Sequence, residues 1–94
     1  PPRKADHKYY SKVWFMVKKT TETNGGKVEE YYTNPKIKKG QNFDFNAKAN
    51  WSKSKLKGQK FGRKNLAQIH ADTWFNHAMR ENQNYDVEVV EIWN

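Results

Sequence analysis

The stretch that decides the fold is residues 9–20, which read YYSKVWFMVKKT. In an extended chain, side chains point alternately to opposite faces. The apolar residues then divide between the two faces, with Val13, Phe15 and Val17 on one and Trp14 and Met16 on the other. Because both faces are apolar in the middle, the pattern predicts a central strand that is covered on both sides.

A tight turn follows this strand. The dipeptide Asn24-Gly25 tolerates the positive φ angles of a hairpin, and Gly26 adds further freedom. The chain should therefore return as a second strand over residues 27–33, KVEEYYT, which its two glutamates make partly exposed. Pro35 ends this strand, since proline donates no ladder hydrogen bond.

The last third of the chain predicts a helix. Asn65 can cap it, and it runs from Leu66 to about Glu81. Apolar residues recur at helical spacing along one stripe. The members of this stripe are Ala67, Ala71, Trp74, Phe75 and Ala78. Asn82 or Asn84 can end the helix in a left-handed conformation.

Residues 85–93, YDVEVVEIW, predict the final strand. Its alternation slips at Val90, where either a bulge or burial on both faces would account for the pattern. The predicted class is α+β, with a three- or four-stranded antiparallel or mixed sheet and one helix packed on one face. We expect the 94 residues to form a single domain.

The middle of the chain, residues 36–64, holds most of the charge. It contains ten basic residues and one acidic residue, for a net charge of +9, whereas the whole chain carries +8. Residues 42–51 alternate and predict a third strand, with Phe43 and Phe45 facing inward. A mobile basic loop would then run to Arg63; the alternative is one long, poorly ordered loop.

Cations next to flat aromatic side chains suit phosphates that are joined to stackable bases. We therefore expect binding to DNA or RNA, without sequence specificity, because lysine dominates and bidentate arginine is scarce. The residues predicted to neutralise phosphates are Lys36, Lys38, Lys39, Lys48, Lys53, Lys55, Lys57, Lys60, Arg63 and Lys64. Trp51 and Phe61 would stack on bases if they are exposed, and ordinary core packing is the alternative for both.

Two other functions stay open. The first is a protein-interaction module, such as a phage-encoded inhibitor that binds an acidic surface of a host protein or nucleic-acid enzyme. Acidic residues of the second and last strands give the molecule the opposite pole that this hypothesis favours. The second is a small metal-free ribonuclease, which needs a general base, an acid and nearby positive charge. Its candidate residues are Tyr31, Tyr32, His70, Asp72 and His77, and their spacing singles out none of them.

The sequence offers no catalytic or metal-binding motif. His70 and His77 are seven residues apart, whereas a helical zinc pair needs a spacing nearer four. There is no cysteine, no glycine-rich phosphate loop and no apolar run near the roughly 20 residues of a membrane span. We expect a cytoplasmic protein without a cofactor, with a frayed basic arm over residues 1–8 and an oligomeric state that the sequence leaves open.

Overall fold

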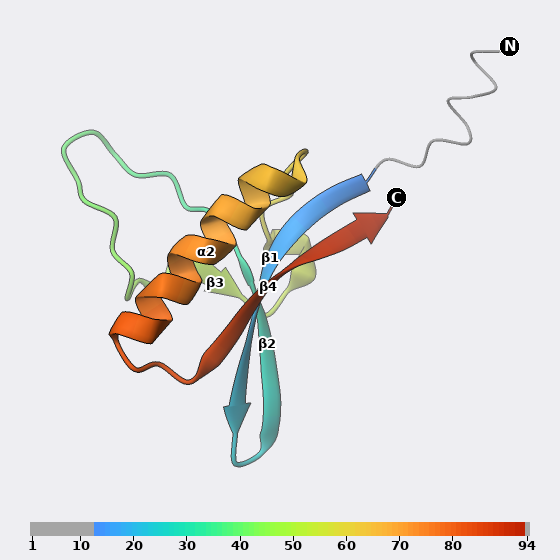
Figure 1. The fold of residues 1–94 in the computed structure, drawn as a ribbon. Helices are drawn as coiled ribbons and strands as arrows, with labels where there is room; N and C mark the ends of the chain where they lie inside the picture. Colours follow the sequence, from blue (N-terminus) through green and yellow to red (C-terminus); the bar gives the residue numbers. More distant parts are fainter. Residues whose placement is uncertain (1–12, 94) are drawn as a thin grey trace, which may run out of the picture.

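The computed structural model describes residues 13–93, so the predicted basic arm at residues 1–8 lies outside the described residues. Within them, four strands form an antiparallel sheet in the order β3-β2-β1-β4, with α2 packed on one face (Figure 1). The strands are β1 (Val13–Thr23), β2 (Gly26–Tyr32), β3 (Trp51–Ser52) and β4 (Tyr85–Trp93), and the helix α2 is Lys64–Arg80. The predicted α+β class is confirmed.

The strand β1 is central, as its sequence predicts. Its fully buried Met16 and Val17 point to opposite faces of the sheet, and Val17 joins the core beneath α2. Pairing with β4 is unbroken, from Val13 opposite Trp93 to Thr21 opposite Tyr85. This continuous register shows no bulge at Val90, so partial burial on both faces accounts for the slipped pattern.

The helix begins two residues earlier than predicted. Arg63 occupies the N-cap position, so Asn65 lies within the first turn instead of capping it. At the other end, Asn82 adopts the predicted left-handed conformation, with a φ of 52°. The buried stripe contains three alanines and Trp74, but the inclusion of Phe75 was wrong. Phe75 is 46% exposed because it lies about 100° around the helix from Trp74.

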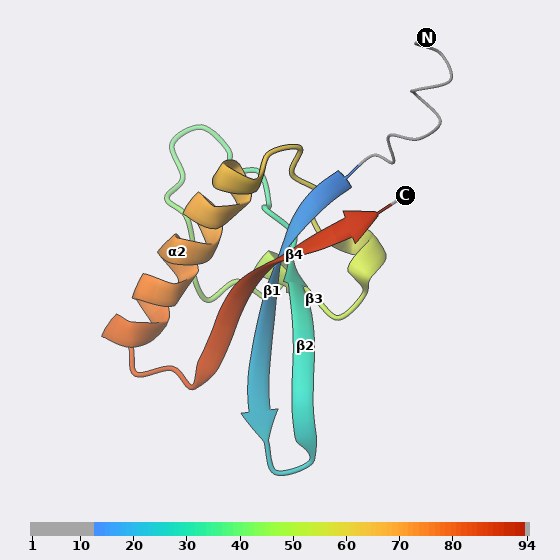
Figure 2. The ribbon, with the colours of Figure 1, turned by 45° about the vertical axis from the view of Figure 1, so that its right-hand side comes forward.

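The hairpin between β1 and β2 extends beyond the helix (Figure 2). Its positive φ falls on Gly26, at 119°, instead of on Asn24 or Gly25 as the sequence suggested. The Thr23 hydroxyl donates a hydrogen bond of 2.7 Å to the Gly26 carbonyl and so closes the turn. Gly26 is therefore the residue of the turn that needs the conformational freedom of glycine.

The predicted third strand over residues 42–51 was wrong. Only Trp51 and Ser52 pair with β2, and the preceding residues form turns and a short 3-10 helix, η1 (Lys48–Asn50). Local hydrogen bonds account for this difference. The Asn50 side chain donates to the Asp44 carbonyl at 2.7 Å, and the Asp44 carboxylate accepts from the Asn46 backbone at 2.9 Å.

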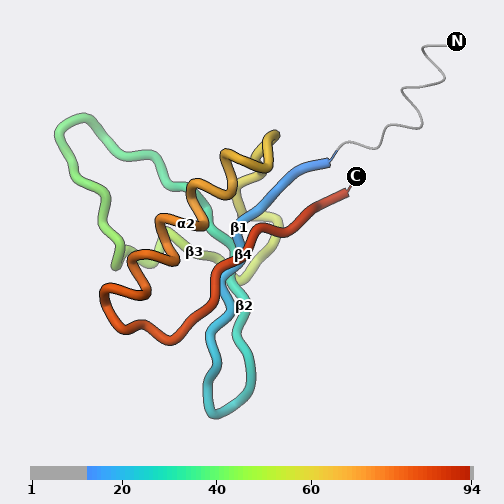
Figure 3. Tube along the Cα trace, in the orientation of Figure 1, coloured from blue at the N-terminus to red at the C-terminus, as the bar shows by residue number. Residues whose placement is uncertain are grey.

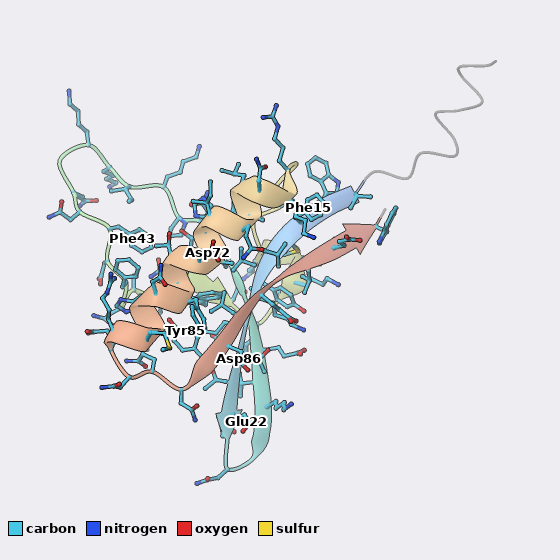
Figure 4. All side chains as sticks on the ribbon, viewed as in Figure 1. Phe15, Glu22, Phe43, Asp72, Tyr85 and Asp86 are labelled. Carbon is cyan, nitrogen blue, oxygen red and sulfur yellow. The ribbon has the colours of Figure 1, made fainter. Side chains whose placement is uncertain are left out.

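Phe43 and Phe45 nevertheless face inward, as predicted. Their ring centroids lie 5.8 Å and 5.0 Å from that of Trp74. Figure 4 shows Phe43 on the loop beside α2. The segment thus covers one flank of the core through its side chains, without contributing a strand there.

The predicted mobile loop from residue 53 to Arg63 is instead tied to the sheet. It contains a second 3-10 helix, η2 (Lys55–Lys57), and then fills a gap where β1 and β2 diverge. There the Gln59 backbone N–H donates to the Tyr32 carbonyl at 2.8 Å, and Phe61 exchanges two backbone hydrogen bonds of 2.8 Å with Phe15. These bonds satisfy backbone groups that the divergence would leave unpaired.

Gly58 is required where this segment crosses the sheet face opposite α2. A Cβ placed there would collide with the buried Met16 Cε and lie 2.9 Å from the Tyr31 Cβ. We expect Gly58→Ala to lower the free energy of unfolding by about 1–3 kcal/mol, measured by urea denaturation. The matched control is Gly25→Ala, whose Cβ would lie 4.0 Å from its nearest neighbour. Equal stability of the two variants would contradict this close packing.

Candidate nucleic-acid interface

The ten basic side chains of residues 36–64 are all exposed. None of them forms an ion pair within residues 13–93. Figure 4 shows long, nitrogen-tipped side chains extending outward from the loop and from the start of α2. The charge of this segment is therefore not neutralised by contacts within the described part of the chain.

Carboxylates of the sheet pair instead with lysines of the sheet. Lys18 lies 3.1 Å from Glu29 and 3.2 Å from Glu88, and Lys19 lies 3.7 Å from Glu30. At the hairpin, Lys27 lies 4.0 Å from Glu22. Glu29, Glu30 and Glu88 thus compensate strand lysines, and the middle segment has no ion pair within the described residues.

The basic residues do not form one flat patch. Those before residue 48 lie on the loop beside α2, whereas η2 lies across the sheet, as Figures 1 and 2 show. The short edge strand β3 connects these two regions, and the last basic residues lead into α2 (Figure 3). We call this arrangement the basic belt. Its members are Lys36, Lys38, Lys39, Lys48, Lys53, Lys55, Lys57, Lys60, Arg63 and Lys64.

Phe61 takes the core-packing alternative, so its predicted stacking on bases was wrong. It is 3% exposed, and its ring lies 4.9 Å from that of His70. The backbone ladder with Phe15 holds its side chain beneath the start of α2. Phe61 therefore contributes to stability and has no surface to offer a ligand.

Trp51 is shared between the core and the surface. Its ring is half-buried, with an edge-to-face contact to Trp74 at 5.0 Å and a tilted contact to Tyr32 at 5.6 Å. Lys19 Nζ lies 4.6 Å from the Trp51 centroid and 5.0 Å from that of Tyr85. Both distances suit cation–π contacts.

Beside Trp51 the structure forms a groove that the sequence analysis missed. The groove has a volume of about 580 Å³ and lies between β3, the end of α2 and the start of β4. Its lining includes Trp51, Tyr85 and His77 together with Lys19, Lys48 and Lys53. The sequence could have indicated the position of Lys19, because strand alternation places Lys19 on the same face as the core residue Val17.

The pKa values of two neighbouring lysines shift in opposite directions. Desolvation lowers the pKa of Lys19 below its usual range, and Glu30 only partly opposes this change. The hydrogen bond that Lys18 donates to Glu29, with a further one to Glu88, outweighs desolvation and raises the pKa of Lys18. Lys19 is thus a cation held at the groove by one carboxylate and two rings.

The candidate ribonuclease residues are only partly brought together. His70 lies 5.4 Å from Tyr32, where burial lowers the pKa of His70 and raises that of Tyr32. His77 instead stacks on Phe45 at 4.2 Å. Both histidines therefore pack against aromatic rings.

The remaining nuclease candidates lie elsewhere. Asp72 is exposed and accepts a hydrogen bond from Gln68 at 2.9 Å, while Tyr31 points to the sheet face opposite Tyr32. Within residues 13–93, no group of three histidine or acidic side chains is placed to hold a metal ion. The structure thus does not assemble the five candidates into one site.

Together, the sheet, the single face covered by α2 and the basic belt define an α+β fold with a cationic, partly aromatic surface. Comparison of the chain with protein-family models, curated proteins and solved structures finds no match. Within residues 13–93, α2 is too short and too polar to cross a membrane.

Proposed function

We propose that this protein binds nucleic acid, DNA or RNA, through the basic belt. One observation carries the proposal: ten cationic side chains are exposed and have no ion-pair partner within residues 13–93. Like charges on one small protein repel one another, and a polyanion relieves that repulsion while releasing its own counterions. Lysine accounts for nine of the ten, so the contacts are directed at phosphates and do not read bases.

We propose that the protein binds nucleic acid in the cytoplasm and does not catalyse a reaction. The belt supplies charge at several points around one edge of the sheet, whereas the acid–base candidates are dispersed. A chain without cysteine suits a reducing compartment. We also propose that the 94 residues form a single domain.

A protein partner is the second candidate, and one specific observation favours it. Two apolar side chains lie exposed among the lysines: Leu56 is 90% exposed and Ile37 is 48% exposed. Apolar anchors within a charged rim are typical of protein interfaces. An acidic partner, such as the target of a phage-encoded inhibitor, would use the same belt.

Fluorescence anisotropy with mixed-sequence oligonucleotides tests the proposal. We expect binding to single- or double-stranded DNA or RNA at low salt, with a steep loss of affinity as the salt concentration rises. Affinity should vary little among sequences, because phosphates are the main contacts. No binding to any of these ligands at low salt would refute the proposed function and favour a protein partner.

A further inference from the structure

We propose that the groove beside Trp51 holds an unpaired base of a single-stranded nucleic acid, while Lys48 and Lys53 at its margin contact the adjoining phosphates. This inference rests on the proposed function, because it specifies which kind of nucleic acid the belt selects. It concerns a cavity that charge counting along the sequence did not find.

The distribution of the belt favours a flexible strand over a duplex. Its cations lie beside α2, at the edge strand β3 and, on η2, across the sheet. A duplex is nearly straight over distances far longer than this molecule, so it meets the charges of one side only. A single strand bends at each nucleotide and can follow the belt from one side of the sheet to the other.

The groove has the composition that an unpaired base requires. Its aromatic lining includes Trp51, Tyr85 and His77, and every base has a π-face that packs against such rings. Its volume of about 580 Å³ falls within the usual range for sites that bind small ligands.

The charge of the groove suits the phosphates on either side of such a base. Lys19, Lys48 and Lys53 line it, and Glu30 is the only acidic lining residue among residues 13–93. Because Glu30 already lies 3.7 Å from Lys19, its charge is compensated within the protein. Lys48 and Lys53 are exposed and unpaired within the described residues, so they remain available to phosphate oxygens.

The test uses ligands that differ in bases while retaining phosphates. Wild-type protein is titrated, at one low salt concentration, with a labelled single-stranded oligonucleotide, the same strand with abasic sites throughout, and the matching duplex. We expect the intact strand to bind roughly tenfold more tightly than the abasic strand, because stacking of a base is lost. We also expect it to bind more tightly than the duplex.

Variants then locate the effect. Trp51→Leu should reduce the difference between intact and abasic strands to nearly nothing, whereas Phe75→Leu should leave it unchanged. Phe75 is the matched control, since it is an exposed ring on α2 that does not line the groove. Urea denaturation of each variant confirms folding, and the comparison of ligands on wild-type protein stands even if Trp51→Leu does not fold.

The outcomes separate this inference from the function on which it rests. Equal binding of intact strand, abasic strand and duplex would overturn the base-binding groove and leave nucleic-acid binding in place. A free nucleoside monophosphate that binds as tightly as the strand would also overturn it, because the groove would then serve small ligands. No binding of any strand or duplex would refute the function itself.

Discussion

Replacing Trp74 with alanine should remove a large share of the free energy of unfolding. Trp74 is 3% exposed, and its ring contacts those of Phe43, Phe45, Trp51 and Tyr32 at centroid distances of 5.0–5.8 Å. Removing a large buried ring costs about 3–5 kcal/mol. A domain of this size has a total stability of roughly 5–14 kcal/mol, so the loss takes a large share of it.

Urea denaturation followed by fluorescence or circular dichroism measures this loss. The matched control is Phe75→Ala, because Phe75 is the next residue on the same helix but is 46% exposed. We expect the control to cost about 1 kcal/mol or less. Similar losses from the two variants would show that the core is not organised around Trp74.

This dependence on one ring follows from the composition of the core. Ala67, Ala71 and Ala78 bring α2 close to the sheet but fill little volume themselves. Aromatic residues from β2, β3 and the loop then meet around Trp74. Small residues on the helix and large rings from the other segments thus form one interlocking layer.

The regular elements could be predicted because their periodicity reflects burial. The strand β1 alternates on two apolar faces, and β4 was predicted with its observed bounds, 85–93. The alanine stripe of α2 has helical spacing. Residues 42–51 misled the prediction because they also alternate, yet Asp44 and Asn50 form local hydrogen bonds that compete with strand pairing.

The candidate site could be predicted only in part. Exposure of the basic residues follows from the cost of burying unpaired charge, so all ten were expected at the surface. Their distribution around the sheet depends on how Gln59–Phe61 enters the gap between β1 and β2, which is a tertiary event. The groove likewise joins Trp51 to Tyr85 across 34 positions of sequence, and no local pattern signals such proximity.

Replacing Lys53, Lys55 and Lys57 with alanine should weaken nucleic-acid binding roughly 100- to 500-fold near 0.1 M salt. Each phosphate contact contributes about 0.7–0.9 to the slope of log affinity against log salt concentration. At 0.1 M salt, this slope corresponds to a factor of about five to eight in affinity for each contact. The factors for three contacts multiply. All three side chains are exposed and make no ion pair within residues 13–93, so the fold should tolerate their removal.

A single substitution away from the belt controls for the change in net charge. Lys27 lies on the hairpin, where it contacts Glu22 at 4.0 Å, and it carries the same charge as Lys55. We expect Lys55→Ala to weaken binding about fivefold or more and Lys27→Ala to have a much smaller effect. Equal losses would mean that net charge, not the position of the belt, determines affinity.

The most direct test of the basic belt is the salt dependence of binding, measured by anisotropy for the wild-type protein and the triple lysine variant. If the belt contacts phosphates, log affinity should fall linearly with log salt concentration, and the slope of the variant should be smaller in magnitude by about 2–3. Parallel lines for the two proteins would show that these lysines neutralise no phosphates, which contradicts the account.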